Sequence, residues 1–123
     1  MFEYPVVHSC VFCQQENLVL IAENALAFAI RDRFPVRKLH SLILPKRHVG
    51  DSFDLTAAEV VAIFNLAREV RASILVEDSS IGGFNFGTNN GAIAGQKIAH
   101  VHFHLIPRRF GEEDPPAAKG SVG

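Results

Sequence analysis

The sequence has little of what several large classes of protein require. Its 123 residues contain only two cysteines, too few for a disulfide-stapled scaffold. Net charge is −1, and the basic residues form no stretch longer than Pro45-Lys46-Arg47 and its surroundings, so we expect no nucleic-acid partner. No apolar window approaches the ~20 residues that span a bilayer. The N-terminus lacks a positive segment followed by an apolar run, so we predict no signal peptide. These absences predict a soluble, cytoplasmic protein without a membrane partner.

What is present suits one globular domain, because 48% of the residues are hydrophobic and 20% are charged. Strands are predicted over 18–22, 25–30, 40–45 and 84–88. Asn24 is expected to form a left-handed hairpin turn between the first two. Thr56 and Glu59 form a capping box that begins a helix over about 57–76. Its apolar positions follow the helical period and predict core contact: Val60, Ile63, Phe64, Ala67, Val70 and Ile74.

The segment from His100 to Pro107 alternates three histidines with apolar residues. In a strand, His100, His102 and His104 share one face, and Val101, Phe103 and Leu105 line the other. Three interpretations compete. The row is an exposed polar face, or it converges on a metal ion, or one imidazole is a nucleophile that its neighbours orient. Catalysis is favoured because histidine is an uncommon choice for an exposed strand face.

Cys10 and Cys13 form a Cys-x-x-Cys motif within an N-terminal stretch, residues 1–16, that reads as irregular. The pair is a redox site, half of a zinc site, or two thiols without function. A redox pair is expected at the start of a helix after a strand, and neither element is evident there.

Residues 89–96 form a glycine-containing loop that leads into the histidine segment. Its glycines allow backbone N–H groups to cradle a phosphate, although a flexible connector also needs them. Residues 111–123 are acidic and contain proline and glycine. We divide the chain into a domain over 1–110 and a C-terminal tail that is mobile or docked on a partner.

The histidine row, its Gly-x-x-x-Gly-Gln lead-in and the Ile-Pro-Arg strand end together resemble the histidine triad (HIT) family. The likeness runs from about Cys10 to Arg109, and within the family it is to bacterial members related to dinucleoside polyphosphate hydrolases. It implies an α+β fold: a five-stranded antiparallel sheet with one long helix and a small helical segment. It also implies a homodimer in which the sheets join, and in such a dimer we expect the tail to lie across the partner near its site.

The family's chemistry is nucleotidyl transfer or hydrolysis at an α-phosphate through a nucleotidyl-histidine. The resemblance implies a purine nucleotide substrate such as a dinucleoside polyphosphate or an adenosine phosphoramidate. It also implies that the reaction requires no catalytic metal. By matching positions, His102 is the nucleophile, His104 binds phosphate oxygen and His100 lies at the rear of the site. The remaining matched positions are Asp32 at the ribose, Asn89 at the phosphate, the lead-in Gln96, and His40 behind the triad.

Two residues depart from the family pattern. Lys97 stands where many relatives have Ser or Thr, so it either approaches a leaving phosphate or is a solvated surface lysine. Leu39 stands where relatives usually have glycine, which predicts a different local backbone.

Zinc is a separate expectation. Cys10, Cys13, His48 and His100 form a Cys₂His₂ set typical of structural zinc, as in zinc-bearing HIT proteins. His8 is a rival ligand, and an empty site is the other alternative.

Two further functional hypotheses stay open. One is a nucleotide-binding regulatory module whose turnover is incidental. The other is a metal-dependent hydrolase in which the three histidines are the ligands.

Overall fold

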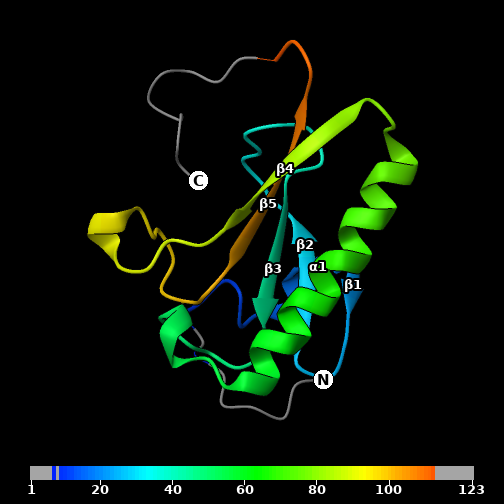
Figure 1. Cartoon of the computed structure of the whole chain (residues 1–123). Helices are drawn as coiled ribbons and strands as arrows, with labels where there is room; N and C mark the ends of the chain where they lie inside the picture. Colours follow the sequence, from blue (N-terminus) through cyan, green and yellow to red (C-terminus); the bar gives the residue numbers. More distant parts are fainter. Residues whose placement is uncertain (1–6, 8, 113–123) are drawn as a thin grey trace.

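The computed structural model describes residue 7 and residues 9–112, and it has the expected α+β architecture. Five antiparallel strands form one sheet in the order β1-β2-β3-β5-β4. They are β1 (Ala22–Glu23), β2 (Ala27–Arg31), β3 (Ser41–Pro45), β4 (Ile81–Gly87) and β5 (Phe103–Arg109). One long helix, α1 (Ala57–Glu77), crosses the sheet (Figure 1). The short 3-10 helices are η1 (Gln15–Asn17), η2 (Ser52–Asp54) and η3 (Ala92–Ala94).

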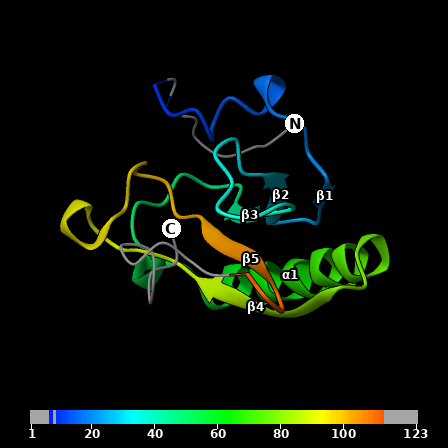
Figure 2. The ribbon, with the colours of Figure 1, turned by 90° about the horizontal axis from the view of Figure 1, so that it is seen from above.

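The two faces of the sheet have different covers. Figure 2 shows α1 on one face and the N-terminal segment on the other. On the α1 face, Ala27 and Ala29 of β2 pack with buried residues of the helix such as Leu66. On the opposite face, the intervening residues Phe28 and Ile30 pack against the N-terminal segment. Because both faces are covered, β2 is buried along almost its whole length.

The hairpin is present, but its turn differs from the expectation. Asn24 accepts hydrogen bonds through Oδ1 from the N–H groups of Leu26 and Ala27, at 3.1 and 2.9 Å. The side chain therefore closes the turn, and Asn24 does not adopt a left-handed backbone. The first strand is also shorter than predicted, since β1 has only two residues.

Helix α1 begins as predicted, and both hydrogen bonds of the capping box form. The Glu59 N–H donates to Thr56 Oγ1 at 3.1 Å, and the Thr56 N–H donates to Glu59 Oε1 at 2.9 Å. The predicted apolar stripe is only partly correct, because Val60 and Phe64 are 41% and 46% exposed. Leu66 is fully buried instead. Ile63, Ala67, Val70 and Ile74 are buried as predicted, so the buried face is shifted only slightly from the expected one.

The fourth strand begins at Ile81 rather than at residue 84, so it includes the two glycines expected to precede it. A register shift between Ile81 and Gly83 accommodates them as a bulge. The ring of Phe110 lies against Gly82, where a Cβ atom would be only 2.5 Å from it.

Leu39 adopts the left-handed conformation that glycine favours, with φ of 71°. It is the only residue other than glycine with positive φ in the described part of the chain. It lies in a turn closed by the His40 N–H and the Arg37 carbonyl at 3.1 Å. Such a backbone costs a leucine about 1–2 kcal/mol, and packing of its side chain against the core beneath α1 offsets this cost. The expectation that this backbone differs from that of relatives with glycine stays a prediction.

Across the described residues, no helix has both the length and the apolarity that crossing a bilayer requires. Most of the expected C-terminal tail, from residue 113 onward, lies outside the described residues.

Candidate functional site

The histidine segment is only partly a strand. β5 begins at Phe103, so His100 and His102 precede it and His104 alone lies within it, opposite Leu42 of β3. The three histidines are 0%, 9% and 7% exposed, in chain order. This burial contradicts the interpretation of the row as an exposed polar face. Phe103 and Leu105 pack toward α1, as the alternation predicted.

His102 has one ring nitrogen committed and one available. Its Nδ1 lies 2.8 Å from the carbonyl oxygen of His100. A carbonyl only accepts, so Nδ1 carries the proton and Nε2 keeps its lone pair. Burial lowers the pKa of His102, so the ring is neutral at physiological pH. Thr88 Oγ1 donates to the His102 carbonyl at 2.8 Å and holds its backbone. Neutral His102 with a free Nε2 is a competent nucleophile.

The tautomer of His104 is set by its hydrogen bond with His40. The Val36 N–H donates to His40 Nδ1 at 3.0 Å, so the proton of His40 resides on Nε2. That nitrogen lies 2.9 Å from His104 Nδ1 and donates to it, which leaves the proton of His104 on Nε2. Burial is the main cause that lowers the pKa of His104 to about 4. His104 is therefore a neutral donor through Nε2, suited to an anionic oxygen.

Asp32 lies beside this pair. Its Oδ2 is 3.4 Å from His40 Nε2 and 3.9 Å from His104 Nδ1, and its Oδ1 accepts the Phe34 N–H at 2.9 Å. Asp32, His40 and His104 are close enough to surround an ion. However, the Val36 N–H occupies His40 Nδ1, so Nε2 holds a proton in place of the lone pair that a metal needs.

The three-histidine metal site is not formed. In the described part of the chain, His100 groups with the cysteines, His104 groups with Asp32, and His102 belongs to neither cluster. This arrangement contradicts the metal-dependent hydrolase that uses the three histidines as ligands.

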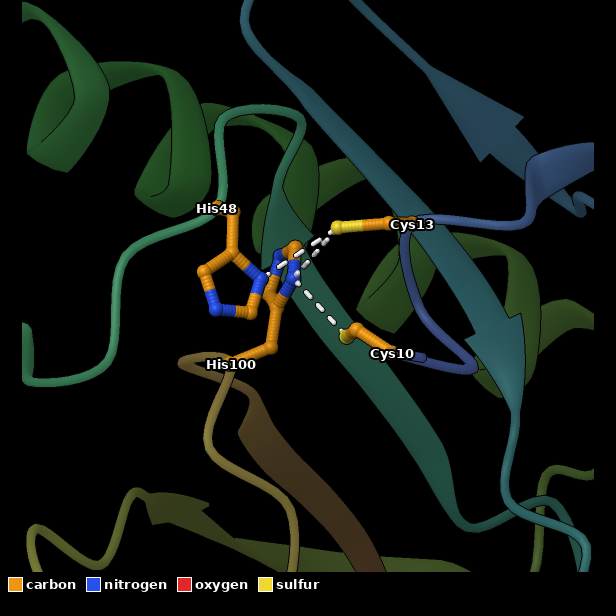
Figure 3. A group of neighbouring side chains, drawn as sticks. All are labelled: Cys10, Cys13, His48 and His100. Carbon is orange, nitrogen blue, oxygen red and sulfur yellow. Dashed lines mark hydrogen bonds between the residues drawn. The ribbon is translucent and has the colours of Figure 1, made fainter. Parts of the chain in front are cut away.

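The Cys-x-x-Cys motif meets two histidines at the rear of the site. Figure 3 shows the thiols of Cys10 and Cys13 facing the rings of His48 and His100. Cys13 Sγ is 3.3 Å from His48 Nδ1 and 3.7 Å from His100 Nδ1, and Cys10 Sγ is 3.6 Å from His100 Nδ1. Zinc bond lengths of 2.0–2.3 Å place tetrahedral ligands roughly 3.3–3.8 Å apart, so the four atoms fit this ion. His8, the rival ligand, lies outside the described residues.

The tautomer of His100 also suits a cation. His100 Nε2 donates to the Pro45 carbonyl at 2.9 Å, which leaves the Nδ1 lone pair facing the sulfurs. Burial is the main cause that raises the pKa of the Cys13 thiol. A divalent ion between the sulfurs would reverse this and stabilise the thiolates.

The glycine-containing loop is held by Gln96. Its Oε1 accepts the Gly91 N–H at 2.7 Å, and its Nε2 donates to the carbonyls of Gly50 and Ile98 at 2.7 and 3.0 Å. Both ends of the amide therefore shape the loop. Gly91 and Gly95 have φ of 91° and 99°, which glycine alone adopts readily. A Cβ atom on Gly95 would lie 3.4 Å from Asn89 Nδ2, so the loop passes close to that amide.

Lys97 is exposed and borders a cavity of about 340 Å³ next to the cysteine cluster. The cavity is lined by Val7, Ser9, Cys10, Val11, His48, Lys97, Ile98 and Ala99. The positive charge of Lys97 is the smallest of the causes that shift the pKa of His104, and it lowers it. Lys97 thus lines the cavity beside the cysteine cluster, and its charge has a small effect on His104.

Several contact residues were not identified from the sequence. Phe12 packs against His100 and His102, with ring centroids 5.9 and 5.2 Å apart. Its position between the cysteines is a signal in retrospect, because any clustering of those cysteines with His100 brings Phe12 to the same place. Val36 and Pro45 act through backbone groups, which no side-chain pattern reveals.

Comparisons with known proteins agree with this geometry. Residues 14–111 match the sequence model of the HIT domain. An adenosine 5'-monophosphoramidase of Schizosaccharomyces pombe is 36% identical over 104 residues, which cover 81% of this chain and 74% of that protein. An adenylylsulfatase of Arabidopsis thaliana is 34% identical over 106 residues, which cover 83% of this chain and 53% of that protein. The crystal structure of a zinc-bound histidine triad family protein from Mycobacterium smegmatis superposes with a TM-score of 0.79 at 28% identity. The match covers 88% of this chain and 81% of that one.

Proposed function

The chain belongs to the HIT domain family, and from this we propose that it hydrolyses or transfers nucleotides at the α-phosphate through a nucleotidyl-histidine. The observation that carries the proposal is the hydrogen bond from His102 Nδ1 to the His100 carbonyl at 2.8 Å. It leaves Nε2 of a buried, neutral imidazole free to attack phosphorus.

The proposed reaction has two displacements. His102 Nε2 forms a bond to the α-phosphorus, and the bond from phosphorus to the leaving group breaks with its electron pair on that group. The Nε2–H of His104 donates to a phosphate oxygen as negative charge gathers there. Water then attacks the phosphorus and releases a proton to solvent, and the phosphorus–nitrogen bond breaks with its electron pair on Nε2, which restores neutral His102.

We propose a purine nucleotide as the substrate. The two similar proteins named above act on an adenosine phosphoramidate and an adenylyl sulfate, as their names state. By the positions that match the family, we assign the Asp32 carboxylate to the ribose hydroxyls and the Asn89 amide to the phosphate; the N–H groups of Gly91 and residues 94–96 are engaged within the loop itself. Gln96 would act by shaping that loop, since its amide is engaged by backbone groups.

We also propose a structural zinc ion held by Cys10, Cys13, His48 and His100. The separations among the four ligand atoms support it, as does the His100 tautomer. Such an ion would fasten the N-terminal segment to the rear of the histidine segment. His102 lies outside this ligand set, so the proposed chemistry involves no catalytic metal.

A homodimer completes the proposal. β4 is an edge strand, and the nearby Phe64 of α1 contacts Phe86 with ring centroids 5.3 Å apart. Val60, Val61 and Phe64 leave an apolar strip exposed along α1 beside this edge. A second copy that pairs along β4 would cover it and the unpaired strand. Sedimentation at micromolar concentration is expected to show a dimer, and a monomer would contradict this part.

One assay tests the function directly. A dinucleoside polyphosphate, an adenosine phosphoramidate and adenylyl sulfate are compared side by side with the unmodified protein and His102→Asn. We expect release of AMP from at least one substrate, and a fall of several orders of magnitude in the variant, which still binds AMP. Turnover in His102→Asn within tenfold of the parent would remove His102 as nucleophile. Tight AMP binding without turnover in the unmodified protein would favour the regulatory module.

A further inference from the structure

The segment that carries the proposed nucleophile lies beyond the end of the sheet. Pairing of β5 with β3 ends at Phe103, and pairing with β4 ends at His104. Residues 100–102 are held instead by the stretch that follows β3. The Val101 N–H donates to the Val49 carbonyl at 2.7 Å, and His100 Nε2 donates to the Pro45 carbonyl at 2.9 Å. Residues 45–49 thus form a backbone template for the nucleophilic segment.

The template itself is irregular after Pro45, and Arg47 in its middle ties it to α1. Arg47 Nε donates to Glu59 Oε2 at 3.0 Å, and one terminal nitrogen donates to Glu59 Oε1 at 2.7 Å. The same terminal nitrogen donates to the Asp54 carbonyl at 3.2 Å, in the turn before the helix. The fork of the guanidinium therefore fixes both position and direction, which a single ammonium group does not do.

Glu59 is unusual because it is a charged residue at a buried position. It is only 4% exposed, yet hydrogen bonds from Arg47 are the main cause that keeps its pKa below the ordinary value, so it is charged. The helix cap alone needs one acceptor for the Thr56 N–H. The buried charge is explained by its second task, which is to hold Arg47.

We propose that the Arg47–Glu59 ion pair is a positioning element for the nucleophile. It fixes residues 45–49 against the first turn of α1. That template in turn holds the His100 carbonyl at the place where it sets the tautomer of His102. The catalytic part of this inference rests on the proposed function, whereas the positioning part concerns the fold of residues 100–102.

The test is Arg47→Lys in the zinc-loaded protein, at a temperature where circular dichroism shows it folded. Lysine keeps the charge but not the fork. Arg68→Lys, at an exposed arginine of α1, is the matched chemical control. Ile74→Val, at a fully buried position of α1, controls for lost stability. The measurements are kcat and KM with an adenosine phosphoramidate, zinc content, and the NMR signal of the His102 Nδ1 proton.

We expect Arg47→Lys to lower kcat at least tenfold with KM within twofold, and to broaden or abolish the His102 Nδ1 proton signal while zinc stays bound. In both controls, kcat and KM should stay within twofold of the unmodified protein, and the His102 Nδ1 proton signal should persist. Glu59→Gln, which retains an acceptor for Thr56, should show a smaller loss of the same kind, and it carries the test if Arg47→Lys does not fold.

An unchanged His102 signal in Arg47→Lys would overturn the inference, as would a loss of kcat no larger than that of Ile74→Val. If the unmodified protein turns over no substrate, the proposed function fails. The NMR comparison then still decides the positioning role on its own.

Discussion

His40 and His104 share one hydrogen bond, with Nε2 of His40 2.9 Å from Nδ1 of His104. Because the Val36 N–H occupies the other nitrogen of His40, the proton in this bond comes from His40. The direction of the bond decides that His104 offers an N–H, and not a lone pair, to the substrate.

His40→Phe keeps a buried ring and removes both nitrogens. The Val36 N–H then loses its acceptor, and His104 loses its tautomer. We expect kcat to fall about 100-fold, within the range for loss of a positioned proton donor. An unsatisfied buried donor adds a loss of about 1–3 kcal/mol in the free energy of unfolding. Steady-state kinetics and chemical denaturation measure the two effects. Ser73→Ala is the control, since it removes an α1 hydroxyl that donates to the Val70 carbonyl. A kcat of His40→Phe within threefold of the parent would contradict the tautomer assignment.

Stability should depend on pH through His104. Its pKa is lowered from 6.5 to about 4, so between these values the unfolded chain binds a proton that the folded chain does not. The free energy of unfolding should therefore be highest above pH 6.5, fall as the pH drops toward 4, and lose about 3 kcal/mol from this residue. His104→Asn keeps an acceptor for His40 and removes the titrating ring. The variant should show a shallower fall than the parent in denaturation measured from pH 4 to 7; parallel curves would refute the assignment.

Zinc content tests the rear cluster. Freshly reduced protein should contain about one zinc per chain by mass spectrometry, and less than ~0.2 would count against the site. Cys13→Ser should lose the metal and lower the unfolding temperature by at least ~10 °C, because binding energy at a structural site is folding energy. Brief exposure to chelator that leaves the zinc in place should leave turnover unchanged.

Lys97 is the residue by which substrate classes can be separated. If its amine approaches the leaving group, Lys97→Ser should slow hydrolysis of polyphosphate substrates roughly tenfold more than that of phosphoramidates. Only the polyphosphates develop extra anionic charge on departure. Arg68→Ser serves as the control, since it removes a positive charge at an exposed position of α1. Equal effects on both classes, or none, would assign Lys97 to the solvated surface.

Much of the fold was predictable from local patterns. The capping box of Thr56 and Glu59 uses groups three residues apart, so the sequence alone contains both partners. The alternation of histidines and apolar residues predicted that Phe103 and Leu105 share one face of the strand, since strand geometry is periodic, and both pack toward α1. Predictions that depended on neighbours in space did less well. Val60 and Phe64 fit the helical period yet lie at the margin of the core, because the position of the sheet decides which part of an apolar face is buried.

The sequence by itself determined the chemical inventory: three histidines two residues apart, a Cys-x-x-Cys, and the residues that relate the chain to its family. Only the tertiary structure decided what each imidazole does. His100 offers its Nδ1 lone pair to the thiols because its Nε2–H donates to the Pro45 carbonyl. His102 and His104 take opposite tautomers because His102 Nδ1–H donates to the His100 carbonyl, whereas His104 Nδ1 accepts from His40. Each tautomer depends on which backbone group faces the ring, and every residue type carries the same carbonyl, so no pattern of side chains encodes it.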